Sequence, residues 1–323
     1  WDGVPRLDTL FIVYLGAKDT PYNRAVCRKS FTAAVTRAMI PGYKYDNMVI
    51  LAGPQGIGKS TLLDKMSRGW FNDSIRTFEG KDASELLQGV WLVEVSELDA
   101  FRKTDVARIK QFLSLRADRY RAAYGRHVSE LPRQCVFFGS TNTTDFLQDT
   151  TGNRRFWPVD VGEQPHTKTV WRDLTDDIID QLWAEAKARW QAGESLYLTG
   201  DVEQEAKIKQ EEHREVSARE GLIKDFVEKQ VPVDWSKWPI DRRRDYWAGA
   251  TRTPDGQELE LVDRDRIAAV EIWCELFNGN VRDLKPADTR EFNAILARLD
   301  GWKRSGNVIR VGPYNVQRGF VRA

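Results

Sequence analysis

One nine-residue motif constrains the fold of this chain more than any other feature. Residues 53–61 fit a pattern of glycine, four free positions, glycine, lysine and then serine or threonine. The motif directly follows a short apolar run at 48–52 and directly precedes a helical pattern over 59–68. This strand–loop–helix context is the one that a phosphate-binding loop requires. We expect the nucleotide to contact Gly53, Pro54, Gln55, Gly56, Ile57, Gly58, Lys59, Ser60 and Thr61.

The residue types in this loop suit phosphates and magnesium. Glycines let backbone N–H groups wrap the β- and γ-phosphates, and the start of the following helix adds a positive dipole. Lys59 would place a positive charge against the same phosphates, and the Ser60 hydroxyl would coordinate Mg²⁺. The motif therefore predicts a nucleoside triphosphatase that uses Mg²⁺.

The surrounding segments predict an α/β fold with a parallel sheet. Short apolar runs typical of strands that are buried on both faces alternate with helical patterns. The expected strands are 48–52, 90–95 and 134–139, and the expected helices between them are 59–68 and 103–115. Two further helices, separated at Thr20-Pro21, are expected between Thr9 and Ala38.

The second half of the chain is more helical and more charged. We expect helices within 170–191 and 201–228, and a linker or irregular packing arm in the Trp-, Pro- and Arg-rich stretch 232–256. Two helical patterns followed by two short alternating runs then predict a winged helix-turn-helix. The expected domains are a helical subdomain, an AAA+-like ATPase core, a helical region with linker, and a winged-helix-like DNA-binding domain, at 1–42, 43–165, 166–262 and 263–323.

A triphosphatase of this kind also needs an acid at the end of a neighbouring strand, where it can order Mg²⁺ and activate water. Glu97 falls just past the expected strand 90–95 and is the favoured acid and metal ligand. Glu94 lies within the strand and is the second choice, with a paired structural carboxylate as the equal alternative. For Asp99, an N-terminal helix cap is the better interpretation.

Two later segments add polar groups to this prediction. The strand at 134–139 runs into Asn142, whose amide could orient the attacking water or sense the γ-phosphate. Arg154 and Arg155 follow on an expected loop. In a ring of subunits, one of them could stabilise the transferred phosphoryl group across an interface as an arginine finger.

Charge is balanced overall but not locally. With 49 Lys+Arg against 48 Asp+Glu, any nucleic-acid surface must be local. Residues 110–133 hold six Lys/Arg against two acids, residues 298–323 hold six against one, and both segments contain aromatic residues that bases could stack on. Solvated charged faces are the plainer alternative. The candidate DNA contacts are Arg119, Arg121, Arg126, His127, Lys303, Arg304 and Arg318.

Other compositional features exclude several classes. Three isolated cysteines and three histidines argue against a disulfide scaffold or a zinc module. No apolar stretch is long enough to span a bilayer and no signal pattern opens the chain, so we expect a cytoplasmic protein in the bacterial host cytosol. The start at Trp1 rather than Met suggests a processed chain or a part of a longer one.

Four segments together resemble the virulence-associated protein E family of phage and mobile-element proteins, which is similar to the helicase part of phage primase-helicases in helicase superfamily three. They read GPQGIGKST, WLVEVSELDAFRK, PRQCVFFGSTN and TGNRRFWPV, and both chain ends also look like that family. The resemblance implies a hexameric AAA+-type ATPase that translocates on single-stranded DNA in a central channel. A separate primase is a further partner that the resemblance suggests, since we recognise no primase segment here.

The resemblance assigns roles to particular residues. It implies Lys59 and Ser60 in the phosphate loop, Glu97 as the strand-end acid and Asn142 as the sensor. It also implies a DNA-contacting hairpin over 119–133, with Arg126 and His127 near its tip, and Arg154 or Arg155 as the finger. The strand-end acid departs from the family pattern, because a single Glu stands two residues beyond Val95 in place of an adjacent acidic pair.

The sequence thus favours an ATP-dependent DNA helicase or translocase of phage or mobile-element replication. The first alternative is an ATPase that remodels an origin without unwinding it and uses the C-terminal domain to contact duplex DNA. The second is a small-molecule kinase, which would not need Asn142, the arginine pair or a winged helix.

Overall fold

A computed structural model describes residues 1–96, 103–121, 127–147, 153–214, 217–249 and 258–323. The chain divides into two compact units, Trp1–Glu215 and Val216–Ala323, which we describe separately. No helix in these described ranges is long and apolar enough to cross a membrane. Glu97, Asp99 and Arg126, three of the residues singled out from the sequence, lie outside the described residues.

The N-terminal unit is built on a five-stranded parallel sheet in the order β2-β3-β6-β1-β7. The expected strands 48–52, 90–95 and 134–139 are confirmed as β1, β3 and β6. The five strands are β1 (Met48–Ala52), β2 (Phe71–Asn72), β3 (Leu92–Val95), β6 (Val136–Thr141) and β7 (Phe156–Asp160). Two strands of this sheet were not predicted from the sequence: β2, which is only two residues long, and β7. Pro158 lies within β7, and proline is tolerated there because β7 is an edge strand.

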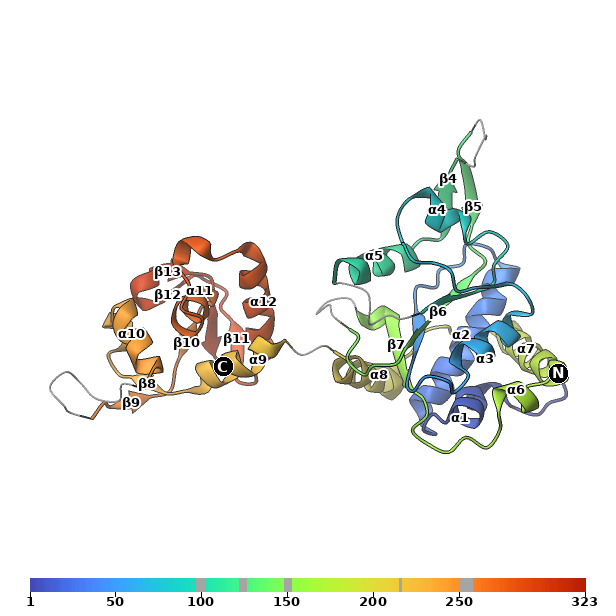
Figure 1. Cartoon of the computed structure of the whole chain (residues 1–323), viewed down its shortest axis with the longest axis horizontal. Coiled ribbons are helices and arrows are strands. Elements are labelled where there is room, and N and C mark those ends of the chain that lie inside the picture. The colour runs from blue at the N-terminus through green and yellow to red at the C-terminus, as the bar shows by residue number, and fades with distance from the viewer. Residues whose placement is uncertain (97–102, 122–126, 148–152, 215–216, 250–257) are drawn as a thin grey trace. The chain divides into compact units, whose positions relative to one another are not determined.

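Helices cover both faces of this sheet, so the unit has three layers (Figure 1). Alternate residues of β1 point to opposite faces: Val49 and Leu51 pack on one side, and Met48 and Ile50 on the other. The first face is covered by α1 (Leu10–Leu15), α2 (Pro21–Met39), α3 (Lys59–Ser67) and α7 (Asp176–Gln191), and the second by α4 (Gly80–Glu85) and α5 (Lys103–Leu113). The strands read as uniformly apolar for this reason.

The predicted break at Thr20-Pro21 is a helix start. The Thr20 hydroxyl accepts a hydrogen bond from the backbone N–H of Asn23 at 3.1 Å, and Pro21 occupies the first turn, where it needs no partner for a missing N–H. Helix α1 ends at Gly16, whose φ of 67° is a left-handed conformation that glycine adopts without strain. The two N-terminal helices predicted from the sequence are therefore confirmed.

The segments that precede and follow the sheet strands along the chain belong to the same compact unit as the sheet. The unit also contains a 3₁₀ turn (Leu7–Thr9), the 3₁₀ turn η3 (Asn153–Arg155), α6 (Val170–Asp173) and α8 (Gly200–Glu212). Leu7, Ile179 and Ala206 join the core on one face of the sheet. The ranges 1–42 and 166–214 thus belong to one compact unit with the sheet and do not form regions apart from it.

A hairpin extends from this unit. Strands β4 (Ala117–Tyr120) and β5 (Ser129–Pro132) pair antiparallel, with Arg119 opposite Glu130. The hairpin points away from the body of the unit, as Figure 1 shows. A hairpin is therefore present just before the strand that leads to Asn142, as the family resemblance implies.

The C-terminal unit combines helices with a three-stranded antiparallel sheet in the order β10-β14-β11. A separate ribbon pairs β12 with β13, and β8 pairs with β9. In chain order the elements are α9 (Ala218–Glu228), β8 (Val231–Pro232), η4 (Trp235–Lys237), α10 (Ile240–Trp247), β9 (Leu261–Val262), β10 (Arg266–Ile267), α11 (Ala269–Glu271) with a π-helical turn (Ile272–Leu276), a 3₁₀ turn (Val281–Asp283), α12 (Pro286–Leu296), β11 (Trp302–Arg304), β12 (Ile309–Arg310), a 3₁₀ turn (Gly312–Tyr314), β13 (Val316–Gln317) and β14 (Phe320–Arg322).

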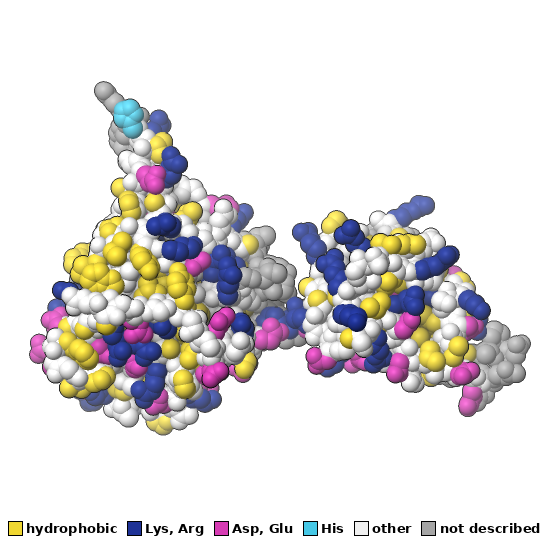
Figure 2. All heavy atoms as spheres, turned by 180° about the vertical axis from the view of Figure 1, so that it is seen from behind, with side chains coloured by type: hydrophobic (Ala, Val, Ile, Leu, Met, Phe, Trp, Pro, Cys, Tyr) yellow, Lys and Arg dark blue, Asp and Glu magenta, His cyan; other side chains and the backbone are white. Residues whose placement is uncertain are grey.

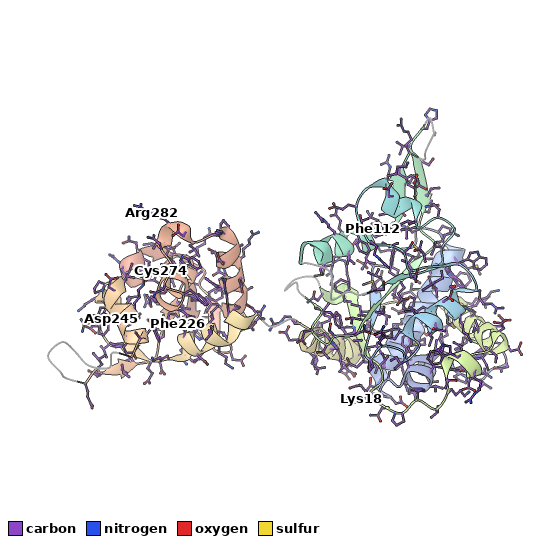
Figure 3. The ribbon with its side chains drawn as sticks, in the orientation of Figure 1. Lys18, Phe112, Phe226, Asp245, Cys274 and Arg282 are labelled. Carbon is purple, nitrogen blue, oxygen red and sulfur yellow. The ribbon has the colours of Figure 1, made fainter. Side chains whose placement is uncertain are left out.

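This unit begins well before residue 263, where the sequence analysis placed a C-terminal domain. Phe226 of α9 packs in the same core as Ile267 and Phe292, and Figure 3 shows Phe226 and Cys274 inside the unit. The stretch interpreted as a linker includes α10, and its Trp235, Trp238 and Tyr246 form a buried aromatic cluster. This stretch folds by burying aromatic side chains and has no regular apolar period. Hydrophobic periodicity in the sequence therefore could not predict its structure.

Candidate nucleotide site

The phosphate loop lies between β1 and α3, and its glycines are required by geometry. A Cβ on Gly53 would come within 2.2 Å of the Val161 carbonyl oxygen, so no larger residue fits against β7 there. Gly58 caps α3 with a φ of 97°, a conformation that residues with a side chain rarely adopt. The loop therefore keeps the close backbone path that phosphate binding by N–H groups needs.

Lys59 is the first residue of α3 and its side chain folds back into the loop. Its Nζ donates hydrogen bonds to the carbonyl oxygens of Gly53 at 2.5 Å and Pro54 at 2.9 Å, and to Oδ1 of Asn142 at 3.1 Å. Burial lowers the pKa of Lys59, while the nearby Glu94 carboxylate opposes that shift. The ammonium is held where a terminal phosphate would meet it.

The adjacency of Lys59 and Asn142 follows from the strand order. β1 and β6 pair in parallel with Ala52 opposite Thr141, so the residues after both strands emerge side by side at the carboxyl edge of the sheet. The Gly53 N–H donates to the Thr141 carbonyl oxygen at 3.1 Å, which extends the pairing into the loop. The structure therefore brings Asn142 to the phosphate loop, as the sequence predicts.

Glu94 is fully buried in β3 and faces the start of α3. Its Oε1 accepts hydrogen bonds from the Ser60 hydroxyl at 2.8 Å and the Ser140 hydroxyl at 2.5 Å. Burial raises the pKa of Glu94, and the two hydroxyl hydrogen bonds partly offset that shift. The second choice from the sequence thus contacts the residue that ends the loop motif's lysine–serine pair, and the first choice, Glu97, lies outside the described residues.

The oxygen atoms beside Ser60 suit a magnesium ion. Glu94 Oε2 is buried and has no hydrogen-bond partner, which is the kind of unsatisfied acceptor that a hard cation satisfies. No cluster of three or more His, Cys, Asp or Glu side chains that could hold a metal occurs within the described residues. Mg²⁺ fits such a site because it usually takes one or two protein ligands and completes its shell with phosphate and water.

An exposed tryptophan lies beside the loop. Trp171 on α6 is 54% exposed and lines a cavity of about 270 Å³ together with Gly58, Ser60 and Asn142. Lys65 of α3 fixes this position by donating to the carbonyl oxygens of Val170 and Trp171 at 2.9 and 3.2 Å. The sequence analysis missed Trp171, because nothing local distinguishes it among twelve tryptophans.

The arginine pair lies at the amino ends of the parallel strands, whereas the phosphate loop lies at their carboxyl ends. Arg154 and Arg155 belong to η3, which immediately precedes β7, whereas the phosphate loop follows the carboxyl end of the parallel strand β1. Arg155 Nε donates to the Ser114 hydroxyl at 3.0 Å and lies 3.5 Å from the Asp46 carboxylate. Arg154 is exposed, and its side chain has no hydrogen-bond or ion-pair partner in the described part of the chain. Neither arginine belongs to the nucleotide site of its own chain.

The hairpin carries fewer exposed charges than the count over 110–133 suggests. Arg119, Arg121 and His127 are exposed, and Arg119 lies 3.5 Å from the Glu130 carboxylate. The Arg133 guanidinium is completely buried against Asp118 at 2.7 Å, and Lys110 is buried as well. Among the described residues, Lys110 and Arg133 therefore do not contribute to a DNA-facing surface, whereas Arg116, Arg119 and Arg121 are exposed.

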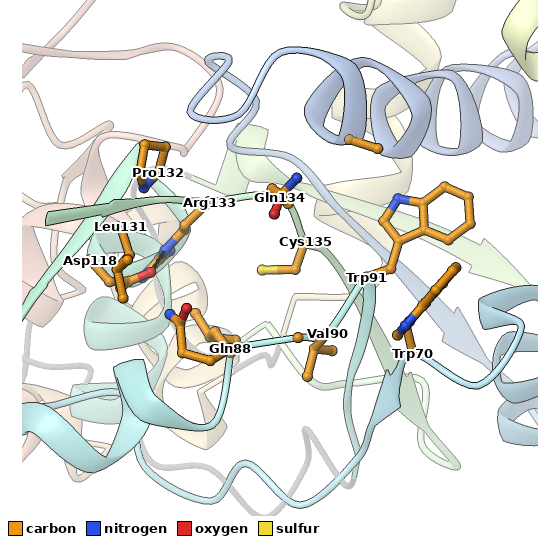
Figure 4. A pocket seen from close by; sticks show the side chains of 13 residues that line it. Trp70, Gln88, Val90, Trp91, Asp118, Leu131, Pro132, Arg133, Gln134 and Cys135 are labelled. Carbon is orange, nitrogen blue, oxygen red and sulfur yellow. Dashed lines mark hydrogen bonds and ion pairs between the residues drawn. The ribbon is translucent and has the colours of Figure 1, made fainter. Parts of the chain in front are cut away.

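A cavity lies at the base of the hairpin. It has a volume of about 350 Å³ and is walled by Trp70, Val90, Trp91 and Leu131, with the Arg133–Asp118 pair at one side (Figure 4). Its lining residues precede β3 and β6, so it lies at the amino edge of the sheet. Since ligands of parallel sheets bind at the carboxyl edge, we do not place the nucleotide here.

The predicted C-terminal contacts are on the surface of their unit. Lys303 and Arg304 on β11 and Arg318 near β14 are exposed. Trp302, the first residue of β11, is buried. Figure 2 shows Lys and Arg side chains spread over the face of this unit that is in view. The positions are compatible with phosphate contacts, which act through exposed positive charge.

The five-stranded parallel sheet and the loop after β1 are consistent with a P-loop nucleoside triphosphatase core. The model of the virulence-associated protein E-like domain matches residues 1–215, so the chain belongs to that family. A search of curated proteins found no match. Among solved structures, the apo NrS-1 C-terminal region is similar with 14% identity and a TM-score of 0.44, over 100% of this chain and 77% of that one. An A-form apo structure of that region has 13% identity and a TM-score of 0.46, over 100% and 76%.

Proposed function

We propose that this protein is an ATP-driven DNA helicase or translocase that acts in phage or mobile-element replication. The observation that carries the proposal is the meeting of Lys59, Asn142, Ser60 and Glu94 at one edge of the sheet. A cation for the terminal phosphate, an amide beside it and a hydroxyl–carboxylate pair for Mg²⁺ are the parts that hydrolysis of a nucleoside triphosphate requires.

In the proposed reaction a water oxygen forms a bond to the γ-phosphorus, and the bond to the β–γ bridging oxygen breaks. Lys59 stabilises the negative charge on the departing phosphoryl group, and Asn142 orients the water. Mg²⁺, when bound, neutralises the phosphates, and Ser60 and Glu94 would hold it. We assign acceptance of the water proton to Glu97, because Glu94 already contacts Ser60.

The base of the nucleotide has a candidate platform in Trp171. Its exposed ring lines the same cavity as the loop, and aromatic faces stack nucleobases with about 1–3 kcal/mol for each base. Trp171→Ala is expected to raise the KM for ATP with little change in kcat, whereas Trp70→Ala, at the other edge of the sheet, should leave the KM unchanged.

The arginine finger would act between subunits of a ring, which we expect to be a hexamer. Arg154 and Arg155 cannot serve the phosphate loop of their own chain, because they precede β7 at the opposite edge of the sheet. Arg154 is the better finger, since its guanidinium is exposed and unpartnered within the described residues. Arg155 would position η3 through Ser114 and Asp46.

Single-stranded DNA is the proposed binding partner of the hairpin. A projecting β4–β5 hairpin with exposed Arg119, Arg121 and His127 could reach the backbone of a strand in a central channel. For the C-terminal unit we infer a winged-helix arrangement that contacts duplex DNA. The helices α11 and α12 lie between β10 and β11 in the chain, and β10 and β11 both pair with β14 in one three-stranded sheet, which supports this inference.

The first test is ATP hydrolysis with and without single-stranded DNA, for the wild type and for an equimolar mixture of Lys59→Ala and Arg154→Ala. We expect DNA to stimulate the wild type and the mixture to recover part of the activity that both variants lose. A mixture of Lys59→Ala with Arg155→Ala is the matched comparison, because Arg155 is expected to position η3 and not to act as the finger. No DNA response together with no recovery on mixing would sink the ring-motor proposal and favour a kinase.

Strand displacement separates the proposal from its nearest alternative. An ATPase that only remodels an origin would respond to duplex DNA and release no strand. We expect unwinding of a forked duplex that is lost in Lys59→Ala. A duplex-stimulated ATPase with no displaced strand would favour the remodelling alternative.

A further inference from the structure

A third cavity is lined by four arginines that the proposed function does not use. It has a volume of about 430 Å³, lies within the C-terminal unit and is bordered by α10, η4, the β9–β10 segment and β12. Arg243, Arg264, Arg266 and Arg310 line it together with Trp235, and the acidic residues Asp263, Asp265 and Glu271 line it as well. This volume is in the range of small-ligand sites.

Several buried donors around this cavity have no acceptor. None of the three guanidinium nitrogens of Arg264 has a hydrogen-bond partner, and the same holds for Arg243 Nε and Trp235 Nε1. The Arg264 side chain is only 2% exposed. Arginine and tryptophan side chains can only donate hydrogen bonds, so each of these five nitrogen atoms needs an acceptor. Since buried polar groups are normally satisfied, these donors call for a further acceptor.

The acidic residues that line the cavity are already engaged by other groups. Asp265 pairs with Arg266 at 2.7 Å, and Asp263 accepts a hydrogen bond from Gln230 Nε2 at 3.0 Å. Arg243 Nη1 lies 3.2 Å from Glu271 Oε1 and 2.8 Å from Glu275 Oε1, and Glu271 Oε2 accepts from the Ala268 N–H at 2.9 Å. Arg264 reaches only Glu271 Oε1, at 3.8 Å, which is beyond hydrogen-bond distance. The Arg264 charge is therefore only partly compensated.

Aromatic rings hold the Arg264 guanidinium in place. Its Cζ lies 4.7 Å from the ring centre of Phe226, 5.5 Å from Trp247 and 5.8 Å from Trp235. At the mouth of the cavity Arg310 is exposed and has no hydrogen-bond or ion-pair partner in the part of the chain that the structure describes. A fixed, planar donor inside and a free cation at the entrance form a built receptor for an anion.

We propose that this cavity is a binding site for a phosphoryl group. A phosphate offers several oxygen acceptors at once and matches the planar fork of a guanidinium in a bidentate manner, which a halide cannot do. The same chemistry is offered by free inorganic phosphate, by a nucleotide and by the backbone of a nucleic acid. The site is separate from the phosphate loop, because all its lining residues belong to the C-terminal unit.

The test is calorimetric titration of the full chain with inorganic phosphate. Lys59→Ala is the background for every variant, so that the phosphate loop does not contribute to the binding signal. We expect one binding event, weakened by about tenfold or more in Arg264→Met and by a smaller factor in Arg310→Met. Arg282→Met is the matched control, since Arg282 is exposed on the same unit and does not line the cavity (Figure 3).

Each outcome decides the proposal. Loss of binding in the two cavity variants, with Arg282→Met unchanged, supports it. No binding event in the Lys59→Ala background, or equal binding in all variants, overturns it. If Arg264→Met fails to fold, as judged by circular dichroism, the exposed Arg310→Met variant decides the matter in the same way.

Competition identifies the source of the phosphoryl group. A short single-stranded oligonucleotide is bound first, and phosphate is titrated afterwards. If the phosphate signal disappears and Arg264→Met also weakens the oligonucleotide, the cavity takes a nucleic-acid phosphate. If the phosphate signal persists, the cavity takes a free phosphate-bearing molecule. Failure of either arm leaves the ATPase proposal intact, because Lys59 and Glu94 lie in the other unit.

Discussion

The two units each contain a buried charged cluster, and the clusters differ in what they leave unsatisfied. Beside the phosphate loop the unpartnered atom is an acceptor, Glu94 Oε2. In the C-terminal cavity the unpartnered atoms are donors of Arg264, Arg243 and Trp235. Since buried polar atoms are rarely left without partners, the first cluster calls for a cation and the second for an anion. The chemistry of a missing partner can thus be inferred from the atoms that await it.

The largest effect is expected at the phosphate loop. Lys59→Ala removes the only side-chain cation whose contacts place it in the loop among the described residues, and should reduce kcat for ATP hydrolysis by about 10²–10³-fold. Steady-state hydrolysis at saturating Mg²⁺ measures this. Phosphate binding in the C-terminal cavity should survive, and its loss in the same variant would contradict the independence of the two clusters.

Glu94→Gln tests the acceptor side of the comparison. The substitution keeps the shape of the side chain but removes its charge, so the Mg²⁺ concentration for half-maximal activity should rise by about 10–100-fold. Ser140→Ala, which removes one hydrogen bond to Oε1, is the matched milder variant. An unchanged Mg²⁺ requirement in Glu94→Gln would transfer the metal-binding role to another acid.

The C-terminal cluster should make stability depend on pH. Burial, together with the neighbouring Glu275, raises the pKa of Glu271 to about 7, although Arg264 and Arg243 oppose the shift. The folded state therefore binds this proton more tightly than the unfolded state does. The resulting stability is complete below the ordinary pKa of a glutamic acid and is lost as pH rises through about 7.

Calorimetric melting at about pH 6 and about pH 8 checks this direction. The unfolding transition of the C-terminal unit should shift to lower temperature at the higher pH, and Glu271→Gln should reduce that difference. An equal shift in the wild type and Glu271→Gln would assign the pH dependence to other groups.

A smaller effect is expected from an ion pair in the N-terminal unit. The His213 Nε2 and Lys209 Nζ both lie 2.9 Å from the Asp160 carboxylate of β7. Burial lowers the pKa of His213, but Asp160 and the Thr144 carbonyl outweigh it and raise the pKa overall. The contribution of this pair is therefore present below the ordinary histidine pKa and lost as pH rises through the raised one.

Asp160→Asn should destabilise the N-terminal unit by about 1–3 kcal/mol, because it leaves two buried or half-buried cations without their partner. Chemical denaturation below and above neutral pH measures the change. The difference from the wild type should be larger on the acidic side, and Asp300→Asn at an exposed position of the other unit is the control. A larger difference on the alkaline side would reverse the sign assigned to His213.

Much of the nucleotide site could be predicted because its signals are local in sequence. The phosphate loop, the buried strand before it and the polar strand end at Asn142 are each encoded in fewer than about ten consecutive residues. The parallel sheet then brings the ends of β1 and β6 together without further information. The choice between Glu94 and Glu97 was not local, since it depends on which carboxylate faces Ser60 across the sheet.

Other features depended on contacts between distant segments. Pro158 concealed the edge strand β7, and the charge count over 110–133 did not reveal that Arg133 is buried on Asp118. Arg264 stands in a charged stretch that looks solvated in the sequence, yet packing against Phe226 buries it. Sequence alone determined the phosphate chemistry, because a loop and its helix are contiguous. Tertiary structure alone decided which charges are buried and left without partners, because burial is a property of segments that meet only in the fold.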